Sequence, residues 1–584
     1  MVKSEKSRKF LAEALKRYGL GRDYIRPQYL KAIEDTRFAL GEQWGDNEKA
    51  QRIGRPCLTI NSQPQFVKSI VNEWRQQRPG IRVRPADSAA TFESAEVIAG
   101  MVRNIETCSK AESIYDGVLE NVVRSGVGYW KLKTKYVHED TFNQEIEIKR
   151  IRDPFSVTFD PAAQEVLKSD ANWAFIEVEI PKEEFEAEWP DAASGWGSNE
   201  YNKQQWHDDK GTVKIAEYYW VEKKEKTIIM FDNGDIMDIT GKGKDFIEAV
   251  EEENGTKVKI DRAGKEMRRK SHERVIHWAK ITAHDVLEET IIPGDYIPIV
   301  PCYGDMVYAD GVDNFSGVVR YNKEPARIVN YLFSESVGAI ALSPRRPVMI
   351  TAEQKEGHET QWNNWHQKNY GNLTYNHVEG HALPRRMDAE TSANAMIGAA
   401  LQFNEQMKEG TSMTNKATLG QHSNEKSGVA IAERKEQGQL GSFNYSDNMN
   451  QSIAYGGQIA VSMIPTVYDT QQIVRLLGED NEVTGEMIND ILSNIDIKNG
   501  KFEVTVEAGI SNATKRQASA EFITSLMSDP VGQQYGQILL PLALKNSDAE
   551  GAKEALEAIQ KQMQPPAETG GQPPLPGGLP PGIQ

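Results

Sequence analysis

The sequence predicts an α+β protein in which a β-rich region separates two helical regions. Apolar side chains recur with the 3.6-residue period of a helix up to about residue 125, and the period changes to 2 between Tyr129 and about Ile281. After the proline-rich stretch 296–304 the helical period returns. A single core stops growing near about 250–300 residues, so we expect roughly two to four cores in this chain of 584 residues.

Helices dominate the N-terminal third. One amphipathic face contains Phe10, Leu11, Ala14, Leu15 and Tyr18, and residues 29–40 also fit a helix. Leu58–Asn61 has strand-forming residues, and Asn61 or Ser62 can cap the helix that follows. That helix stops at Pro79, and its apolar face contains Phe66, Ile70, Val71 and Trp74. Residues 95–123 predict one or two further helices, ended by Gly126-Val127-Gly128.

Alternating apolar and polar residues predict antiparallel strands from 129 to 281. The alternating positions are Trp130/Leu132, Ile146/Ile148, Ala174/Ile176/Val178/Ile180 and Ile215/Tyr218. The stretch IIMFDNGDIMDI is predicted to be a hairpin, because Asn233-Gly234 is a preferred two-residue turn.

Two helices flanking a small aromatic module are predicted next. Pro325 is expected to open the first, which runs to about Ala341 with Ile328, Val329, Leu332, Phe333 and Ile340 on one side. The second runs from about Glu390 to Glu409, with an apolar stripe opposite a polar face. Between them lies a compact segment that contains Trp362, Trp365, Tyr370 and Tyr375.

The C-terminal part begins with a glycine-interrupted helix. Residues 423–441 have helical spacing but contain Gly428, Gly438 and Gly441, each of which costs about 1 kcal/mol in a helix interior. We interpret this as a helix that bends, and it continues to Ile464. Strands at 473–477 and 502–506, two or three helices within 513–563 and a disordered Pro/Gly-rich tail at 564–584 follow.

Composition indicates a folded chain of a reducing compartment. The first residues lack the apolar core of a secretion signal, and no apolar run reaches the roughly 18 residues of a membrane helix. Cys57, Cys108 and Cys302 form no CxxC pair and are expected to be buried structural thiols. The formal charge of −17 is unfavourable for DNA affinity, which comes mainly from Lys and Arg.

Motifs for catalysis or metal binding are weak. No GxxxxGK[ST] or GxSxG sequence occurs, which argues against a P-loop ATPase and an α/β-hydrolase. His377 and His381 have the spacing of two zinc ligands, but the segment offers no third ligand, so we expect no metal or cofactor. Carboxylates are abundant, and a carboxylate-based hydrolase in the β-rich region stays as the enzymatic alternative.

Five stretches in the same order resemble one family. They are FALGEQW with RPCLTIN and VNEWRQQRPGIRVRPAD; VVRSGVGYWKLKTKY; YIPIVPCYG with GVVRYNKEPARIVNYLFSES; the stretch 423–441 continuing to IPTVYD and IVRLLG; and KFEVTVEAGISNATKRQAS. Together they resemble the P22-like portal proteins of tailed bacteriophages. Some relatives end in a long helical barrel, which we do not expect here because this chain ends in a Pro/Gly-rich tail.

The resemblance implies a non-enzymatic virion protein. Copies form a ring, commonly of twelve, at one capsid vertex, where DNA is packaged and later ejected. The implied domains are a wing (1–315 and 425–511), a stem (316–341 and 389–409), a clip (342–388), a tunnel loop (410–424) and a crown (512–563). Another connector or structural ring of a virion is the nearest alternative.

The resemblance also suggests why the chain has a large negative charge. Twelve copies of −17 give about −204, and an acidic bore lets DNA slide because few phosphates are neutralised. Glu405 and Glu409 are candidates for a repulsive lining, and Lys408, Lys416 and His422 for a weak grip. A solvated polar face is the alternative for all five.

The clip region supplies the candidate partner-binding residues. They are Arg345, Arg346, Trp362, Trp365, Arg385 and Arg386. The arginines would bind an acidic patch on the terminase motor or on the head-completion or connector protein, or else be solvent-exposed. The aromatic residues would pack across subunits or fill the module's own core. Major capsid and scaffolding proteins are further implied partners, no membrane is implied, and assembly is expected in the host cytoplasm.

Overall fold

The chain divides into two compact units, Met1–Arg75 with Ile81–Glu507, and Gln76–Gly80 with Ala508–Gln584. The computed structural model describes residues 5–76, 78–86, 91–190, 192, 207–208, 212–232, 236–242, 247, 250, 257–260, 266–342, 348–364, 370–386, 397–402, 443–468, 472–477, 483–488, 502–507, 523 and 540. The predicted C-terminal helices and tail therefore lie almost wholly outside the described residues. Apart from the end residues Gln76 and Gly80, the labelled helices and strands belong to the first unit.

Helix α1 (Glu5–Ala39) is one continuous helix of 35 residues that includes Pro27. The predicted apolar face is confirmed: Ala14 and Tyr18 are buried, and Phe10, Leu11 and Leu15 pack against the same cluster over the sheet. Tyr18 also donates a hydrogen bond from its hydroxyl to Glu177 Oε1 at 2.9 Å. The two helical stretches predicted from the sequence thus belong to a single element.

The predicted strand at Leu58–Asn61 is wrong. This segment has no regular secondary structure and joins no sheet among the described residues, and it follows the short helix α2 (Asp46–Gln51). Its backbone N–H groups at Leu58 and Ile60 donate instead to side chains of helix α8. Asn61 does cap the next helix, α3 (Gln63–Gln76), by accepting a bond from Gln63 N at 3.2 Å.

Two helices, α4 (Phe92–Cys108) and α5 (Ala111–Ser125), follow strand β1 (Gly80–Pro85), as the sequence predicts. Helix α5 ends at Gly126, whose φ of 88° is left-handed. A Cβ there would lie 2.6 Å from the backbone carbon of Ser316, so only glycine fits. The chain then enters a three-stranded sheet of order β11-β2-β3, made of Ile299–Tyr303, Val127–Tyr136 and Gln144–Arg150.

The larger sheet confirms the predicted change of period. Its strands run in the order β10-β9-β7-β5-β4, and β6 and β8 also pair with β7. In chain order its elements are the short helix η1 (Pro154–Ser156), β4 (Val157–Phe159), β5 (Trp173–Pro181), α6 (Lys182–Glu188), β6 (His207–Asp208), β7 (Thr212–Met230), β8 (Ile236–Asp238), β9 (Arg268–Ile281) and β10 (Val286–Ile292). The predicted hairpin is the β7–β8 pair, although Asn233-Gly234 lies outside the described residues.

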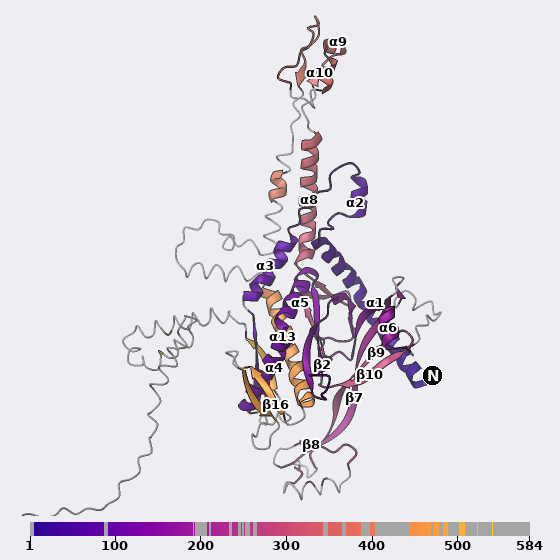
Figure 1. The fold of residues 1–584 in the computed structure, drawn as a ribbon, viewed down its shortest axis with the longest axis vertical. Helices are drawn as coiled ribbons and strands as arrows, with labels where there is room; N and C mark the ends of the chain where they lie inside the picture. Colours follow the sequence, from indigo (N-terminus) through magenta and orange to yellow (C-terminus); the bar gives the residue numbers. More distant parts are fainter. Residues whose placement is uncertain are drawn as a thin grey trace, which may run out of the picture. The chain divides into compact units, whose positions relative to one another are not determined.

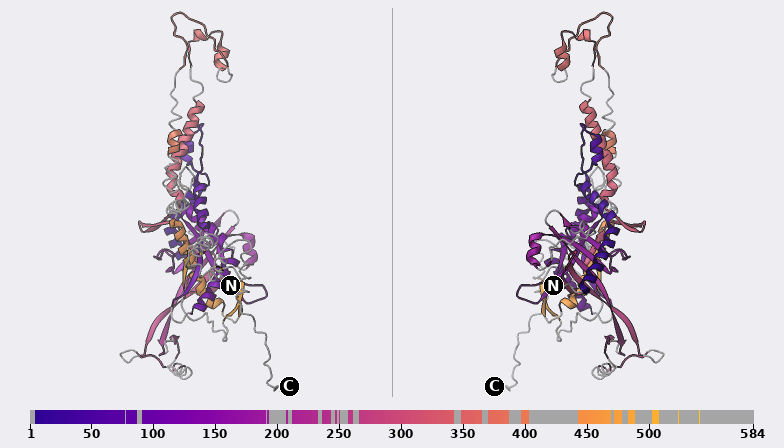
Figure 2. Two further views of the ribbon diagram at one scale, coloured as in Figure 1. Left: turned by 90° about the vertical axis from the view of Figure 1, so that its left-hand side faces the viewer. Right: turned by 90° about the vertical axis from the view of Figure 1, so that its right-hand side faces the viewer.

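Strands β7 and β9 extend beyond β5 and β10, and β8 pairs with the far end of β7 from Ile228 to Met230. The partner β5 ends opposite Trp220, and β10 ends opposite Ile276, whereas β7 and β9 stay paired as far as Ile229 and Arg268. Figure 2 shows these long strands leaving the sheet.

Helix α8 (Val318–Leu342) follows the hairpin of β12 (Asp305–Ala309) and β13 (Val312–Ser316). The predicted start at Pro325 is wrong, because the helix begins seven residues earlier and contains this proline. The first turn is held by Arg320, whose guanidinium donates to Phe315 O and to Asp35 of α1. Figure 1 shows α8 as the long helix with α2 beside it.

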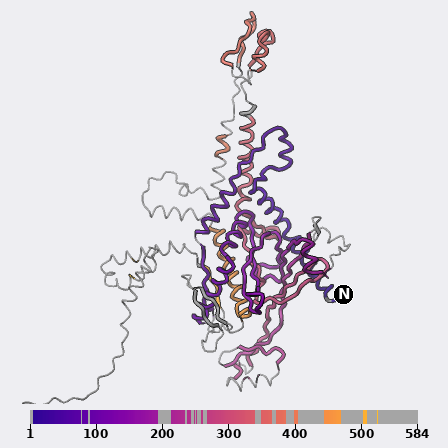
Figure 3. Tube along the Cα trace, viewed as in Figure 1, coloured from indigo at the N-terminus to yellow at the C-terminus, as the bar shows by residue number. Residues whose placement is uncertain are grey.

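The main core joins distant parts of the sequence. Helix α13 (Phe443–Val467) packs against α4, α5, β11 and β18 (Phe502–Glu507), and β18 pairs with β1. Figure 3 shows this orange helix beside the indigo N-terminal helices. Ile453, Ile459 and Met463 of α13 are buried with Val118 and Val122 of α5. The hairpin of β16 (Gln472–Leu477) and β17 (Val483–Ile488) includes the predicted strand at 473–477.

Candidate functional site: helix α8 and its anchors

Helix α8 has an unusual distribution of polar and apolar residues. The side facing its own chain buries Asn322, Asn330 and Ser334, together with Ala326 and Val329. The opposite side carries an apolar stripe, which we define as Tyr321, Pro325, Ile328 and Leu332, at the i, i+4, i+7, i+11 positions of one helical face. Tyr321 is 56% exposed and Ile328 39%. The prediction that Ile328 and Val329 share one side is therefore wrong.

The base of α8 is fixed to α1 by buried charges. The Asp35 side chain is fully buried and lies 2.7 Å from both Arg320 Nη2 and Lys323 Nζ. Lys323 also lies 3.0 Å from Glu34, and its hydrogen bond holds the pKa of that carboxyl below its usual range. The buried carboxylate of Asp35 thus links α1 to α8. Separating the helices would leave buried charges without their counter-charges, which is destabilising.

A polar clasp holds the middle of α8. Asn330 Oδ1 accepts a bond from Ile60 N at 2.8 Å, and its Nδ2 donates to Gln43 Oε1 at 2.5 Å. Gln43 in turn donates to Asn61 Oδ1, while Ser334 Oγ accepts from Leu58 N. These bonds satisfy backbone groups of a segment that has no strand partner among the described residues. They also join FALGEQW to RPCLTIN, since Gln43 belongs to the first stretch and Leu58 and Asn61 belong to the second.

Arg52 extends the clasp one turn further along α8. Its guanidinium lies 2.6 Å from Glu335 and is stacked over the rings of Trp44 and Tyr331, at 5.3 and 5.0 Å from their centroids. The side chain is only 8% exposed. Aromatic stacking and ion pairing therefore act on the same cation and orient it.

Residues 348–364 and 370–386 form a small module with its own contacts. It contains β14 (Val348–Met349), α9 (Ala352–Lys355), α10 (Glu359–Asn364) and β15 (Arg385–Arg386), with β14 paired to β15. Trp362 is buried, and its Nε1 donates to Thr374 O at 2.7 Å. The buried Gln354 donates to Ala382 O. The predicted compact segment is thus a hydrogen-bonded unit.

The sequence-predicted site residues are only partly described. Trp362 lies inside the module, Arg385 is exposed on β15, and the backbone of Arg386 pairs with Val348. The residues outside the described part are Arg345, Arg346, Trp365, Glu405, Lys408, Glu409, Lys416 and His422. Of the predicted second stem helix, residues 397–402 are described and are helical.

Asp35, Gln43 and Asn330 were not predicted from the sequence as functional anchors. All three lie in stretches that carry the family resemblance, FALGEQW being one and KEPARIVNY another, or next to one. Their partners are distant in sequence, so the sequence alone did not single them out as buried anchors.

Glu177 is a carboxylate of the β-rich region that pairs with a cation. Burial raises the pKa of Glu177, and this side chain lies 3.1 Å from Arg22 and accepts a bond from Tyr18. His381 lies 3.7 Å from Glu353, and no group of three potential metal ligands occurs among the described residues. None of the described helices has the length and apolar character needed to cross a bilayer.

Glu106 on α4 is expected to make the stability of the protein depend on pH. Burial raises its pKa to about 7, and Tyr115 donates to its Oε1 at 2.9 Å. The folded state therefore keeps this proton at pH values where the unfolded state, with a pKa near about 4.3, has lost it. We expect wild-type stability to fall by about 1–3 kcal/mol between pH 4.5 and 7.5 relative to Glu106→Gln. Urea unfolding at several pH values measures this difference.

The matched control is Glu96→Gln, at an exposed position of the same helix. Its stability curve should run parallel to that of the wild type across the same pH range. Parallel curves for Glu106→Gln as well would contradict the raised pKa.

Comparisons with known proteins cover almost the whole chain. The family described as phage P22-like portal protein matches residues 15–577. A protein named "Portal protein", from Acyrthosiphon pisum secondary endosymbiont phage 1, is 26% identical over 565 residues, which cover 91% of this chain and 78% of that protein. The sequence similarity thus includes both the anchors of α8 and the module that follows it.

Proposed function

Because the chain belongs to the phage P22-like portal protein family, we propose that twelve copies close into a ring at one capsid vertex and that double-stranded DNA passes through its bore. The protein is a structural component of the virion, and its family forms oligomeric rings in phage heads. We further propose that it has no catalytic activity and depends on a separate terminase ATPase for force. Assembly would take place in the host cytoplasm.

The observation that carries this proposal is the apolar stripe of α8. Monomeric proteins rarely leave an apolar helical face uncovered. In α8 the side facing its own chain is fixed by polar and charged contacts, while Tyr321 and Ile328 stay exposed. A neighbouring copy in a ring would bury this stripe. The ion pairs to α1 and the clasp to 43–61 would hold α8 at the angle that ring closure requires.

The domain boundaries extend this proposal along the chain. The stem would consist of 316–341 and 389–409, the clip of 342–388, the tunnel loop of 410–424, the wing of 1–315 and 425–511, and the crown of 512–563. The clip would dock the terminase motor and later the connector, through Arg345, Arg346, Arg385 and Arg386. Trp362 and Trp365 would support that surface, and capsid and scaffolding proteins would contact the ring.

The bore is proposed to be acidic with a few weak cationic contacts. Glu405 and Glu409 would repel the duplex, and Lys408, Lys416 and His422 would contact it. Strong neutralisation of phosphates would oppose sliding, because each neutralised phosphate adds affinity. The formal charge of −17 per copy fits a conduit that does not retain its cargo.

Electron microscopy of the purified protein tests the proposal. A portal should show rings with a central hole wide enough for duplex DNA and a narrow clip end. Rings without such a hole would favour another virion connector, and a monomer inside assembled particles would overturn the proposal.

Deleting Ser412–Gln421 tests the tunnel loop. We expect the deletion to spare ring assembly but to lower packaged DNA or its retention by roughly tenfold, because it removes Lys416 from every subunit and one exposed ion pair contributes at most about 1 kcal/mol. Packaged DNA per particle, measured by quantitative PCR after nuclease treatment, gives the result. Unchanged packaging and retention would remove the loop from the mechanism.

A further inference from the structure

The paired stretch of β7 and β9 beyond β5 and β10 is strongly basic. We name residues 222–229 of β7 and 268–275 of β9 the basic ribbon. It contains seven cationic side chains, Lys223, Lys224, Lys226, Arg268, Arg269, Lys270 and Arg274, against three carboxylates, Glu222, Glu225 and Glu273, in a chain whose formal charge is −17. Nearly all of these side chains are exposed or half-buried. Such a local charge reversal on a projecting element favours contact with an acidic surface.

One face of the basic ribbon concentrates this charge. Side chains alternate between faces along each strand, and Lys223 lies opposite Arg274 while Thr227 lies opposite Lys270. Lys223, Arg268, Lys270 and Arg274 therefore share a face. Within the ribbon its carboxylate is Glu225, and Glu266 lies 2.5 Å from Arg268. Like charges directly opposite each other destabilise a strand pair. Among the described residues, Lys223 and Lys270 have no ion-pair partner.

The opposite face is more nearly balanced. Lys224 is paired across from Glu273 and lies 3.8 Å from Glu222, which also contacts His277 at 3.0 Å. Carboxylates lie among the cations of the ribbon and repel phosphates, so DNA is disfavoured as its binding partner. They fit a protein surface of mixed but mainly acidic character.

This chain itself carries such a surface on α6. The helix has four exposed carboxylates, Glu183, Glu184, Glu186 and Glu188, and is anchored by the buried Phe185. Glu186 lies 3.5 Å from Lys182 and Glu188 lies 3.8 Å from Lys280. Glu183 and Glu184 have no ion-pair partner among the described residues. The unmatched carboxylates of α6 thus complement the unmatched cations of the ribbon.

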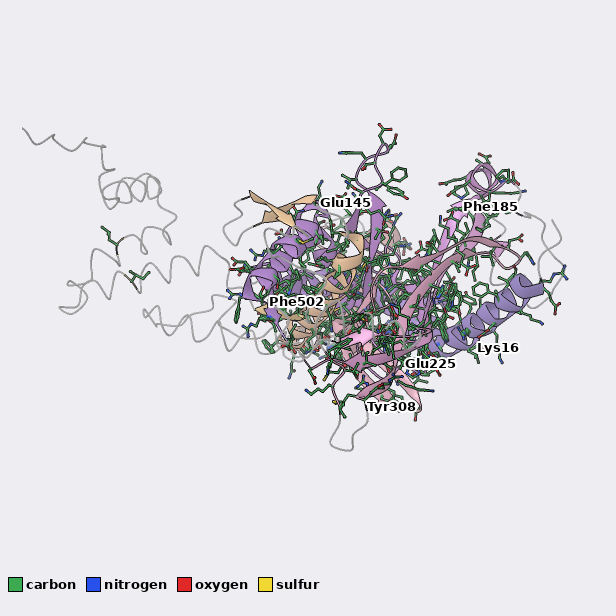
Figure 4. The ribbon with its side chains drawn as sticks, turned by 90° about the horizontal axis from the view of Figure 1, so that it is seen from below. Lys16, Glu145, Phe185, Glu225, Tyr308 and Phe502 are labelled. Atoms are coloured by element: carbon green, nitrogen blue, oxygen red, sulfur yellow. The ribbon has the colours of Figure 1, made fainter. Side chains whose placement is uncertain are left out.

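The two surfaces lie at different places on one subunit. Figure 4 labels Phe185 on α6 and Glu225 on the basic ribbon, and they are well separated. A contact between two different patches is heterologous, and such contacts close into rings when the rotation between copies allows. A second copy is also favoured over a free partner, because a ring presents it at high effective concentration and weak exposed ion pairs then suffice.

We propose that the basic ribbon of each subunit docks on α6 of the neighbouring subunit. Ion pairs of Lys223 and Lys270 with Glu183 and Glu184 then orient the subunits and promote ring closure. This inference rests on the proposed ring, and adds to it a second contact besides the stripe of α8.

Charge reversal and charge exchange test the contact. The variants are K223E/K270E, E183K/E184K and the combination of all four changes. The control, K224E/R269E, reverses charges on the opposite face of the ribbon. Sedimentation velocity across a concentration series measures the ring fraction at about 0.15 M and 0.5 M salt, and circular dichroism checks that each variant is folded.

Each double reversal should raise the concentration for half-maximal assembly by at least about tenfold, because attraction becomes repulsion at every subunit contact. The fourfold exchange should restore it to within about threefold of the wild type, and the control should stay within the same range. High salt should weaken wild-type assembly, since it screens exposed charges.

Several outcomes would overturn the proposal. Rings that form normally in both double reversals exclude the contact, and so does a fourfold exchange that fails to restore assembly in a folded protein. Ribbon variants that assemble normally but lose DNA binding in a filter assay would make the ribbon a DNA site instead. If the wild type forms no rings at all, the proposed function fails. That result differs from one in which the wild type forms rings and the variants show that the ribbon does not contact α6.

Discussion

Replacing Asp35 with asparagine is expected to lower the free energy of unfolding of the first unit by about 2–4 kcal/mol. The change keeps the shape of the side chain but removes the charge that lies 2.7 Å from Arg320 and Lys323. Removing one partner of a buried ion pair is costly because the other is left without its counter-charge. In the variant, Lys323 still pairs with Glu34, and Arg320 is partly exposed to solvent. We therefore expect a smaller loss of stability than for a completely buried ion pair.

Hydrogen exchange of α8 and urea unfolding followed by tryptophan fluorescence measure this effect. The exchange of amides in the first turns of α8 should accelerate more than that of α4 or α5, because the lost contact joins α8 to α1. Glu34→Gln is the matched control: that side chain is 58% exposed, and we expect a change of at most about 1 kcal/mol. Equal effects of the two substitutions would show that the buried position of Asp35 does not matter.

The sequence predicted those elements whose apolar face packs on the chain's own core. Helix α3 buries Phe66, Ile70 and Trp74 as its period requires, and the strands at Trp130/Leu132 and Ala174/Ile176 face buried clusters. In these elements local periodicity and tertiary packing agree. Their order also gave the α+β class correctly.

Helix α8 shows where periodicity stops being informative. Periodicity predicts that the apolar side of a helix faces its own chain, but here Asn322, Asn330 and Ser334 do so, and Tyr321 and Ile328 are exposed. The strand predicted at Leu58–Asn61 is wrong for a related reason, since side chains of α8, distant in sequence, supply the bonds that a strand partner would have given. Local propensity cannot encode either contact.

Only part of the candidate site could be predicted from the sequence. The module containing Trp362 was placed between two helices from its aromatic residues, and the structure shows hydrogen bonds between its described segments. The channel residues Glu405, Lys408, Glu409, Lys416 and His422 lie outside the described residues and stay predictions. A polar helix face gives the same sequence pattern whether it lines a bore or faces solvent.

Ile328→Asp is expected to abolish ring assembly while leaving the isolated subunit folded. Ile328 is 39% exposed, so an aspartate there is solvated in the single chain and should change its stability by at most about 0.5 kcal/mol. In a ring the same carboxylate would be buried without a partner at every contact, at a cost of about 2–4 kcal/mol each. Native mass spectrometry would then detect monomers in place of rings, with unchanged circular dichroism.

The control for this prediction is Phe142→Asp, which introduces the same charge at a side chain 96% exposed between β2 and β3. It should assemble like the wild type, because it lies off the apolar stripe. Leu332→Asp, one turn along the stripe from Ile328, should reproduce the loss. If Ile328→Asp and Leu332→Asp both form normal rings, then α8 does not supply the subunit contact, and the exposed apolar stripe needs a different occupant. If Phe142→Asp also blocks assembly, added negative charge rather than burial of the stripe is responsible.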